Sequence, residues 1–416
     1  MRNVLSHFQS VFPFAARNQI FSFFQFFSTV AECRPVLGIE TSCDDTAVSI
    51  VADRILASNR FSDSHVLSRL GGICPSVVAL QHRDLLPVYV KDCLNKSGLR
   101  LSDLGGIAVT TRPGLVIALK AGIIQAIALA RKGHLPLVGV HHMQAHATMA
   151  TFCDRSIHFP FIAFLVSGGH TLISVAYSPT DFELYGKNLT GSCGECIDKI
   201  VRDIQLVTGT YKDGICGSVL ERIASQCSKE ERLKYRIRMP RSCGANFDFT
   251  WIKQHYQSLL KKVYNQQDFN VPAFCGSVEH CLAGYLASRL HNCLEYFRNS
   301  GKINEMCKKI VFCGGVASNL YIRKVLQLIC SEYNMKVFSP PPKFCTDNGE
   351  MIGWNGLLIL KSGGRHPHVY AYDALPVFLP AEARCLIGND LTNDIPLVAT
   401  RKLSVKHLAD SRIVFR

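Results

Sequence analysis

One stretch of sequence decides the fold of this chain, and it reads Val36-Leu-Gly-Ile-Glu-Thr-Ser-Cys-Asp-Asp-Thr-Ala-Val-Ser-Ile-Val51. Apolar and β-branched residues flank a short polar turn, which is the pattern of a β-hairpin. The pattern returns in Phe161-Ile-Ala-Phe-Leu-Val-Ser-Gly-Gly-His-Thr-Leu-Ile-Ser-Val175. Backbone N–H groups and hydroxyls in such turns suit an anion. Because each half of the chain carries one hairpin, we expect duplicated α/β lobes that face each other across a cleft.

Further glycine-rich segments predict turns that lead into helices. Lys309–Asn319 reads as a strand, a glycine turn and the start of a helix. This segment could bind the phosphates or base of a nucleotide, or it could be a plain strand–helix connection. Thr190–Arg202 reads as a glycine loop before an amphipathic helix, whose Asp198 either binds a ribose or amide or faces solvent. Gly217 and Glu221 follow on a second glycine turn and helix, and we expect them to reach the same ligand.

Two histidines, His142 and His146, stand four residues apart after an apolar run. In a helix that starts near residue 141, this spacing puts both imidazoles on one face, where they can share a divalent ion or simply pack the helix start. Zinc peptidases have Glu directly after the first histidine, but here that residue is Met143. The pair therefore suggests a metal that holds a substrate, with Asp347 as third ligand. Asp347 and Thr346 are alternatively caps of a helix expected from residue 348.

Composition limits the class of protein. A chain of 416 residues predicts two lobes, and no run approaches the roughly 20 apolar residues of a membrane span. The net charge of +14 favours a polyanionic partner such as nucleic acid, and the basic cluster Lys229–Arg241 is a candidate surface for it. We expect the 18 cysteines to stay reduced, and Cys193 and Cys196 to lie in a loop without a redox or metal role.

The first 30 residues differ from the rest. They contain Arg, Ser and Phe but no Asp or Glu, and the first acid is Glu32. Such a leader is typical of a mitochondrial transit peptide. We therefore expect residues 1–30 to be removed and the protein to reside in the mitochondrion, although a segment packed on a lobe would also fit.

Five motifs in order resemble the tRNA N6-adenosine threonylcarbamoyltransferase family, in particular its mitochondrial branch. They are Gly38–Thr46, His142–His146, Val166–Thr171, Gly314–Asn319 and Thr346–Asn348. The resemblance covers roughly residues 35–370. It implies an α/β fold of two duplicated ribonuclease-H-like lobes, as in the actin-like, sugar-kinase and Hsp70 ATPase superfamily. The expected lobes are 35–145, completed by about 345–373, and 146–344, with 374–416 as an extension of unknown role.

The resemblance also implies a reaction. A threonylcarbamoyl group passes from threonylcarbamoyl-AMP, made by an upstream synthase, to N6 of the adenosine 3′ of the anticodon in tRNAs that read ANN codons. His142, His146 and Asp347 would hold one divalent metal, zinc or iron, and Asp44 and Asp45 would be catalytic. The implied substrate-binding residues are Leu165, Val166, Ser167, Gly168, Gly169, Asp198, Gly217, Glu221, Ser318, Asn319 and Thr346.

Some positions depart from the family pattern. Gln144 stands where a Glu is frequent between the histidines, and Cys216 replaces the first glycine of a Gly-Gly pair. A homodimer without membrane attachment is expected. The alternatives are an actin-like sugar or carboxylate kinase, which leaves the histidine pair unexplained, a metallopeptidase, which lacks its base at Met143, and a non-enzymatic scaffold.

Overall fold

The computed structural model describes residues 34–63, 73–209, 216–238, 244–302, 308–363 and 366–395. By its internal contacts the chain divides into two compact units. The first consists of Met1–His142 and Asp347–Arg384, and the second of Met143–Thr346 and Cys385–Arg416. The expected transit peptide, residues 1–30, lies outside the described residues, as does the end of the C-terminal extension.

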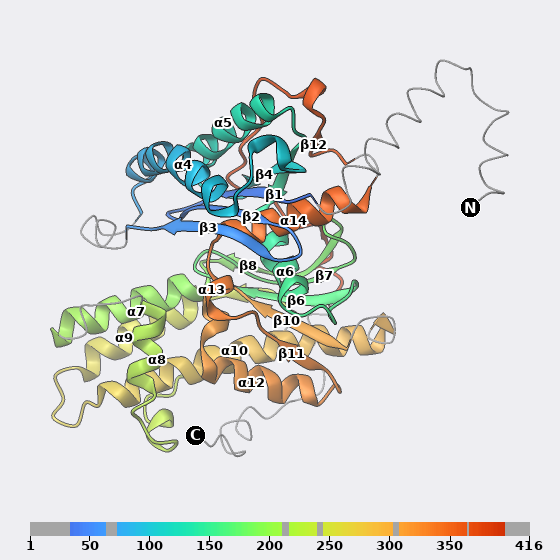
Figure 1. Ribbon diagram of the computed structural model, residues 1–416. Coiled ribbons are helices and arrows are strands. Elements are labelled where there is room, and N and C mark those ends of the chain that lie inside the picture. The colour runs from blue at the N-terminus through green and yellow to red at the C-terminus, as the bar shows by residue number, and fades with distance from the viewer. Residues whose placement is uncertain are drawn as a thin grey trace. The chain divides into compact units, whose positions relative to one another are not determined.

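The first unit is built on a mixed sheet with the strand order β12-β5-β4-β1-β2-β3 (Figure 1). The hairpin of β1 and β2 is antiparallel, and β1, β4 and β5 run parallel. All residues of β1, β2, β4 and β5 are buried. The strands are β1 Val36–Glu40, β2 Thr46–Val51, β3 Ile55–Phe61, β4 Gly106–Arg112, β5 Leu137–His141 and β12 Val369–Tyr370.

Three long helices cover this sheet. Figure 1 shows α4 and α5 on one side of it and α14 on the other. Gly38 explains the close fit of α14, because a Cβ at this position would lie 2.3 Å from the backbone of Gly349. The helices are α4 Pro75–Ser97, α5 Val116–Gly133 and α14 Gly349–Ser362, and two short 3-10 turns are η1 Leu101–Asp103 and η4 Tyr372–Ala374.

The second unit repeats the arrangement. Its sheet has the order β11-β10-β6-β7-β8-β13, the β6–β7 hairpin is antiparallel, and β6, β10 and β11 run parallel. With β9 left aside, the first five strands of each unit in chain order are therefore arranged in the same order, 3-2-1-4-5. The strands are β6 Phe161–Val166, β7 Thr171–Ala176, β8 Phe182–Thr190, β9 Phe247–Asp248 beside β8, β10 Lys309–Cys313, β11 Lys336–Phe338 and β13 Asn389–Asp390.

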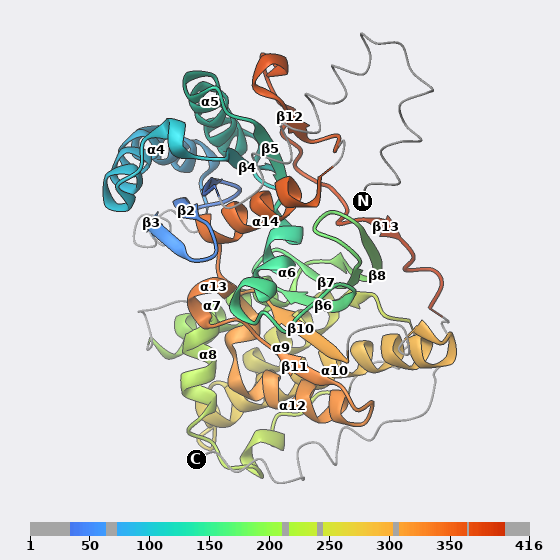
Figure 2. The same cartoon turned by 45° about the vertical axis from the view of Figure 1, so that its right-hand side comes forward.

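Helices pack on both faces of the second sheet. Met143, Ala147 and Ala150 of α6 join one apolar cluster, while α7, α10 and α12 enclose a larger one on the other face (Figure 2). The α-helices are α6 His142–Cys153, α7 Cys193–Thr208, α8 Cys216–Ala224, α9 Thr250–Val263, α10 Val271–Asn299, α12 Leu320–Ser331 and α13 Pro342–Cys345; the 3-10 turns are η2 Glu231–Leu233 and η3 Gly315–Ser318.

The structure confirms the predicted fold class and both hairpins. The prediction that Cys193 and Cys196 lie in a loop is wrong, because Ser192 accepts a hydrogen bond from the N–H of Glu195 and starts α7 at Cys193. The predicted caps of α14 are also wrong. Asn348, one residue later, caps this helix by accepting from the N–H of Met351.

Candidate metal centre and nucleotide-binding loops

Helix α6 begins at His142, as the spacing of the histidines predicted, so His146 lies one turn later on the same face. Asp347 directly precedes the cap of α14, and its Oδ1 lies 3.4 Å from Nε2 of His142. One ligand atom from each of the three side chains lies within 4.8 Å of the others. Both histidines are buried and Asp347 is half-buried. Two imidazoles and a carboxylate at this spacing form a group that can bind a divalent transition metal.

A carboxylate behind the first histidine, Glu40, was missed by the sequence analysis. His142 Nδ1 lies 3.1 Å from Oε2 of this fully buried side chain and 3.2 Å from the hydroxyl of Ser42. Glu40 also accepts from the Ser42 N–H and the Thr110 hydroxyl, both at 2.5 Å. A carboxylate only accepts, so Nδ1 of His142 carries a proton and its Nε2 faces Asp347. An acidic residue at the end of a buried strand was the signal in the sequence.

Negative charge surrounds His142. Burial alone would lower the pKa of this imidazole, but the charges of Asp347 and Glu40 outweigh it and raise the pKa well above its ordinary value. Burial alone would raise the pKa of the Glu40 carboxyl, but the charge and hydrogen bond of His142 hold this pKa below its usual value. A place where two carboxylates favour a second proton on the ring is also a place that favours a metal cation.

Asp44 and Asp45 lie in the β1–β2 turn, as expected, but their environments differ. Asp44 accepts from the Ser62 hydroxyl at 2.8 Å. Asp45 is buried and forms an ion pair with Arg60 at 2.9 Å. Burial raises the pKa of Asp45 to about 7, with the charge of Asp347 acting in the same direction and Arg60 opposing both. Burial thus works against the charged form of Asp45, whereas the ion pair with Arg60 favours it.

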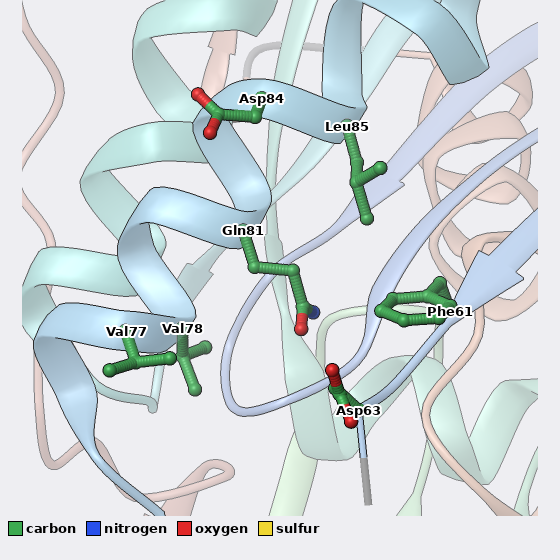
Figure 3. A pocket seen from close by; sticks show the side chains of 7 residues that line it. All are labelled: Phe61, Asp63, Val77, Val78, Gln81, Asp84 and Leu85. Atoms are coloured by element: carbon green, nitrogen blue, oxygen red, sulfur yellow. The ribbon is translucent and has the colours of Figure 1, made fainter. Parts of the chain in front are cut away.

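A cavity of about 300 Å³ opens beside this turn (Figure 3). Gln81 of α4 reaches into it and donates to the carbonyl of Asp44 and to the Thr46 hydroxyl, both at 2.9 Å. The lining of the cavity is mainly apolar, with carboxylates at Asp63 and Asp84. The lining residues are Phe61, Asp63, Val77, Val78, Gln81, Asp84 and Leu85.

The β6–β7 turn of the second unit carries the Ser-Gly-Gly motif. Leu165 and Val166 are buried in β6, whereas a Cβ on Gly168 or Gly169 would meet open space. Ser167 steadies the turn, since its N–H donates to the carbonyl of His170 at 2.7 Å. The open glycines leave the backbone of the turn accessible to a ligand.

Helix α7 packs tightly behind this turn. A Cβ on Gly194 would lie 2.6 Å from the Cα of Gly168, and the Ser192 hydroxyl donates to the Gly168 carbonyl. Asp198 lies half-buried on α7, where burial raises its pKa against the opposing charge of Arg202. Gly217 opens the first turn of α8 and is half-buried.

The start of α12 brings three further predicted residues together. Asn319 caps this helix by accepting from the N–H of Ile322 at 2.9 Å, and Glu221 of α8 accepts from the N–H of Leu320 at 2.7 Å. Ser318 donates to the carbonyl of Gly315 at 2.6 Å. Two amides at the start of α12 are thus engaged by the protein's own side chains, which favours a ribose or base over a phosphate at this helix start.

Thr346 and one departure from the family pattern, Gln144, complete the comparison with the predicted site. Thr346 is half-buried and follows the short helix α13. Gln144 donates to the carbonyls of Thr180 and Ile387, at 3.1 and 2.8 Å, so it holds the segment after residue 385 to the second unit. The described part of the C-terminal extension therefore has a structural role.

The basic cluster is only partly available to RNA. Arg232 is buried and pairs with Glu279, and Lys234 pairs with Asp268 at 2.9 Å. Arg232 is therefore not part of an exposed basic surface, and the exposed Lys234 shares its charge with Asp268. Lys229, Arg236 and Arg238 are exposed, and Arg241 lies outside the described residues.

Comparison with known proteins identifies the family. A family model described as tRNA N6-adenosine threonylcarbamoyltransferase matches residues 54–354. The chain belongs to this family. A Caenorhabditis elegans protein named as a probable mitochondrial tRNA N6-adenosine threonylcarbamoyltransferase is 42% identical, over 92% of this chain and 91% of its own length. The mitochondrial enzyme of this name from Homo sapiens is 31% identical, over 94% of this chain and 96% of its own length.

Solved structures support the fold. Full-length HypF, crystallised in its phosphate- and nucleotide-bound form, superimposes with a TM-score of 0.52 at 12% identity, over 80% of this chain and 47% of HypF. HypF of T. kodakarensis gives a TM-score of 0.50 at 14% identity, over 79% of this chain and 48% of that one. The chain thus spans about half the length of these HypF chains, and the likeness concerns the fold alone. In the described ranges, no helix is both long and apolar enough to cross a bilayer.

Proposed function

We infer that this protein transfers a threonylcarbamoyl group to N6 of an adenosine in tRNA and forms N6-threonylcarbamoyladenosine. The observation that carries this conclusion is the family match over residues 54–354. The grouping of His142, His146 and Asp347 is consistent with the metal site of this family. Neither a kinase nor a peptidase accounts for both observations.

The donor we propose is threonylcarbamoyl-AMP, which an upstream synthase must supply. The acceptor is the adenosine 3′ of the anticodon in mitochondrial tRNAs that read ANN codons. N6 of the adenosine attacks the carbamoyl carbon, the bond from that carbon to the phosphate oxygen breaks, and AMP leaves with the electron pair while N6 loses a proton. A mixed carbamic–phosphoric anhydride is already activated, so the enzyme mainly has to position the reactants and stabilise charge.

His142, His146 and Asp347 would hold one divalent metal, zinc or iron. The residues fit such an ion, because Glu40 contacts the far ring nitrogen of His142 at 3.1 Å and thereby leaves its Nε2 for the ion. When bound, the metal supplies positive charge that polarises or clamps a substrate oxygen. The protein's own part is to keep both imidazoles and the carboxylate in place.

The loops of the second unit would bind the adenylate. The open backbone at Gly168 and Gly169, next to Ser167, suits a phosphate group. Glu221 and Asn319, already bonded to the start of α12, suit the ribose or the base. The remaining proposed contacts lie on the same elements or next to them: Leu165, Val166, Asp198, Gly217 and Ser318, with Thr346 at the end of the unit.

Asp44 and Asp45 would act on the reacting groups. A carboxylate near the attacking amine can accept the N6 proton as the bond to carbon forms. Asp45 fits this role because Arg60 holds its side chain in one orientation, at 2.9 Å. Asp44, held by Ser62, would orient the acceptor.

A reconstituted assay tests the function. Protein lacking residues 1–30 is mixed with threonylcarbamoyl-AMP and unmodified mitochondrial tRNA, and the nucleosides are measured by mass spectrometry. We expect threonylcarbamoyladenosine with the wild type and with His158→Ala, an exposed histidine that serves as control, and none with His146→Ala. Folded, metal-loaded wild type that forms no product would contradict the proposal, and magnesium-dependent ATP hydrolysis would then indicate a kinase.

The tRNA surface is proposed to include Lys229, Arg236 and Arg238, which remain exposed. Neutralising these three should weaken tRNA binding and lower its dependence on salt, because fewer counterions are released. Unchanged salt dependence would remove this surface from the proposal. Lys234→Gln is the matched control, because its charge is already paired with Asp268.

A mitochondrial location and a homodimer complete the proposal. The relatives from worm and human are named mitochondrial, and residues 1–30 contain no acid. A fusion of residues 1–33 to a fluorescent protein should enter mitochondria. For the dimer, α4 and α5 carry exposed apolar side chains that a second copy would cover: Val77, Leu80, Val88, Ile117 and Ile124. Sedimentation of the wild type and of Leu80→Glu should show a dimer and a monomer, respectively.

A further inference from the structure

A buried acid, Glu279, lies in the long helix α10 of the second unit. Its side chain is 1% exposed, in a helix stretch whose residues are nearly all buried. Both carboxylate oxygens are engaged. Oε2 accepts from Nη1 of Arg232 at 2.5 Å, and Oε1 accepts from Nδ2 of Asn319 at 2.7 Å. A charge this deeply buried is costly unless it is paired and hydrogen-bonded, as it is here.

Arg232 completes the pair and joins three helices. The residue is 5% exposed, and its guanidinium donates to the carbonyl of Ala224, at the end of α8, at 2.9 Å. It also lies 4.2 Å from the ring centroid of Tyr321, in the first turn of α12. The planar guanidinium thus binds the carboxylate of Glu279 and stacks on an aromatic ring at the same time, which a lysine ammonium cannot do.

The Glu279 carboxylate decides which way the Asn319 amide points. The amide NH2 must face the carboxylate, so the amide oxygen faces the N–H of Ile322 and caps α12. A flipped amide would bring oxygen against the carboxylate and NH2 against the helix N–H, and both contacts would be lost. The orientation of Asn319 therefore depends on a charge 40 residues away in sequence.

We propose that Glu279 and Arg232 are positioning residues of the transferase, which hold Asn319 and the start of α12 for the adenosine part of the substrate. This inference rests on the proposed function, in which Asn319 and the neighbouring Glu221 contact the adenylate. Neither Glu279 nor Arg232 touches the substrate. They act by keeping the Asn319 amide in one of its two orientations and the first turn of α12 against α8.

Glu279→Gln tests the inference with little change of volume. Glutamine offers one acceptor and one donor where glutamate offers two acceptors, so either Arg232 or Asn319 meets a donor. Two measurements are made on the enzyme lacking residues 1–30, well below the unfolding midpoint of every variant: AMP binding by calorimetry, and kcat and KM for threonylcarbamoyl-AMP. We expect AMP binding to weaken and KM to rise by about tenfold, as for the loss of a charge-assisted hydrogen bond, with little change in kcat.

The same helix provides a matched control. Glu295 of α10 is also buried, at 3% exposure, and bonds to Tyr333 and Arg298 instead of Asn319. Glu295→Gln should lower the unfolding midpoint without changing AMP affinity or KM. Arg232→Lys serves as a second variant should Glu279→Gln fold poorly, and it should weaken AMP binding in the same direction.

Equal AMP affinity in the wild type, Glu279→Gln and Arg232→Lys would overturn the inference, as would an equal loss in Glu295→Gln. A different result would contradict the proposed transferase function while leaving this inference intact. A wild type that binds AMP but transfers no threonylcarbamoyl group, while Glu279→Gln binds AMP more weakly, contradicts the reaction and leaves the positioning role in place.

Discussion

Glu40→Gln should weaken metal binding without altering any of the three proposed ligands. The carboxylate accepts from the Ser42 N–H and the Thr110 hydroxyl and contacts Nδ1 of His142 at 3.1 Å. Glutamine keeps the shape but removes the charge and turns one acceptor into a donor. Loss of such a contact behind a ligating histidine typically costs 10–100-fold in metal affinity, or about 1.4–2.8 kcal/mol. Because Glu40 is fully buried, we expect the upper half of that range.

The assay is competition of the purified protein with a chromogenic chelator for zinc or iron. Glu350→Gln is the control, since this half-buried acid of the same unit accepts from Ser58 at 2.8 Å and not from a histidine. The control should bind metal as the wild type does. If Glu40→Gln also keeps the wild-type affinity within twofold, Glu40 does not orient His142, and the reasoning from the hydrogen bond is refuted.

Three further outcomes follow from packing and burial. Gly194→Ala should lower the free energy of unfolding in urea by about 1–3 kcal/mol, because the added Cβ would lie 2.6 Å from the Cα of Gly168. It should also raise KM for the donor, and an unchanged KM would mean that the glycine turn does not contact the donor. Gly38→Ala should destabilise the protein more strongly, since its Cβ would meet the backbone of Gly349 at 2.3 Å, and wild-type stability would contradict this. Cys196 should resist alkylation in the folded protein, because burial raises its pKa to about 12; labelling is read by mass spectrometry, and rapid modification would count against an inert buried thiol.

Local patterns in the sequence were sufficient for the hairpins and for the histidine pair. Alternating apolar residues and a short turn act over a few positions, so the β1–β2 and β6–β7 hairpins could be predicted from their own residues. The spacing of His142 and His146 is set by the helix period alone. The cap of α14 was misassigned by one or two residues because Thr, Asp and Asn are all good caps, and only the backbone conformation selects Asn348.

The duplicated α/β pattern, the glycine turns and the pair of imidazoles can be predicted from local sequence, because each depends on neighbours a few residues apart. Which distant side chains support these features depends on the folding of the whole chain. Glu40 reaches His142 from 102 residues away, and Arg232, which looked like a surface cation, is buried against Glu279. Partners of this kind depend on which strands and helices become adjacent. That adjacency follows from the packing of the whole unit and leaves no periodic signal in the chain.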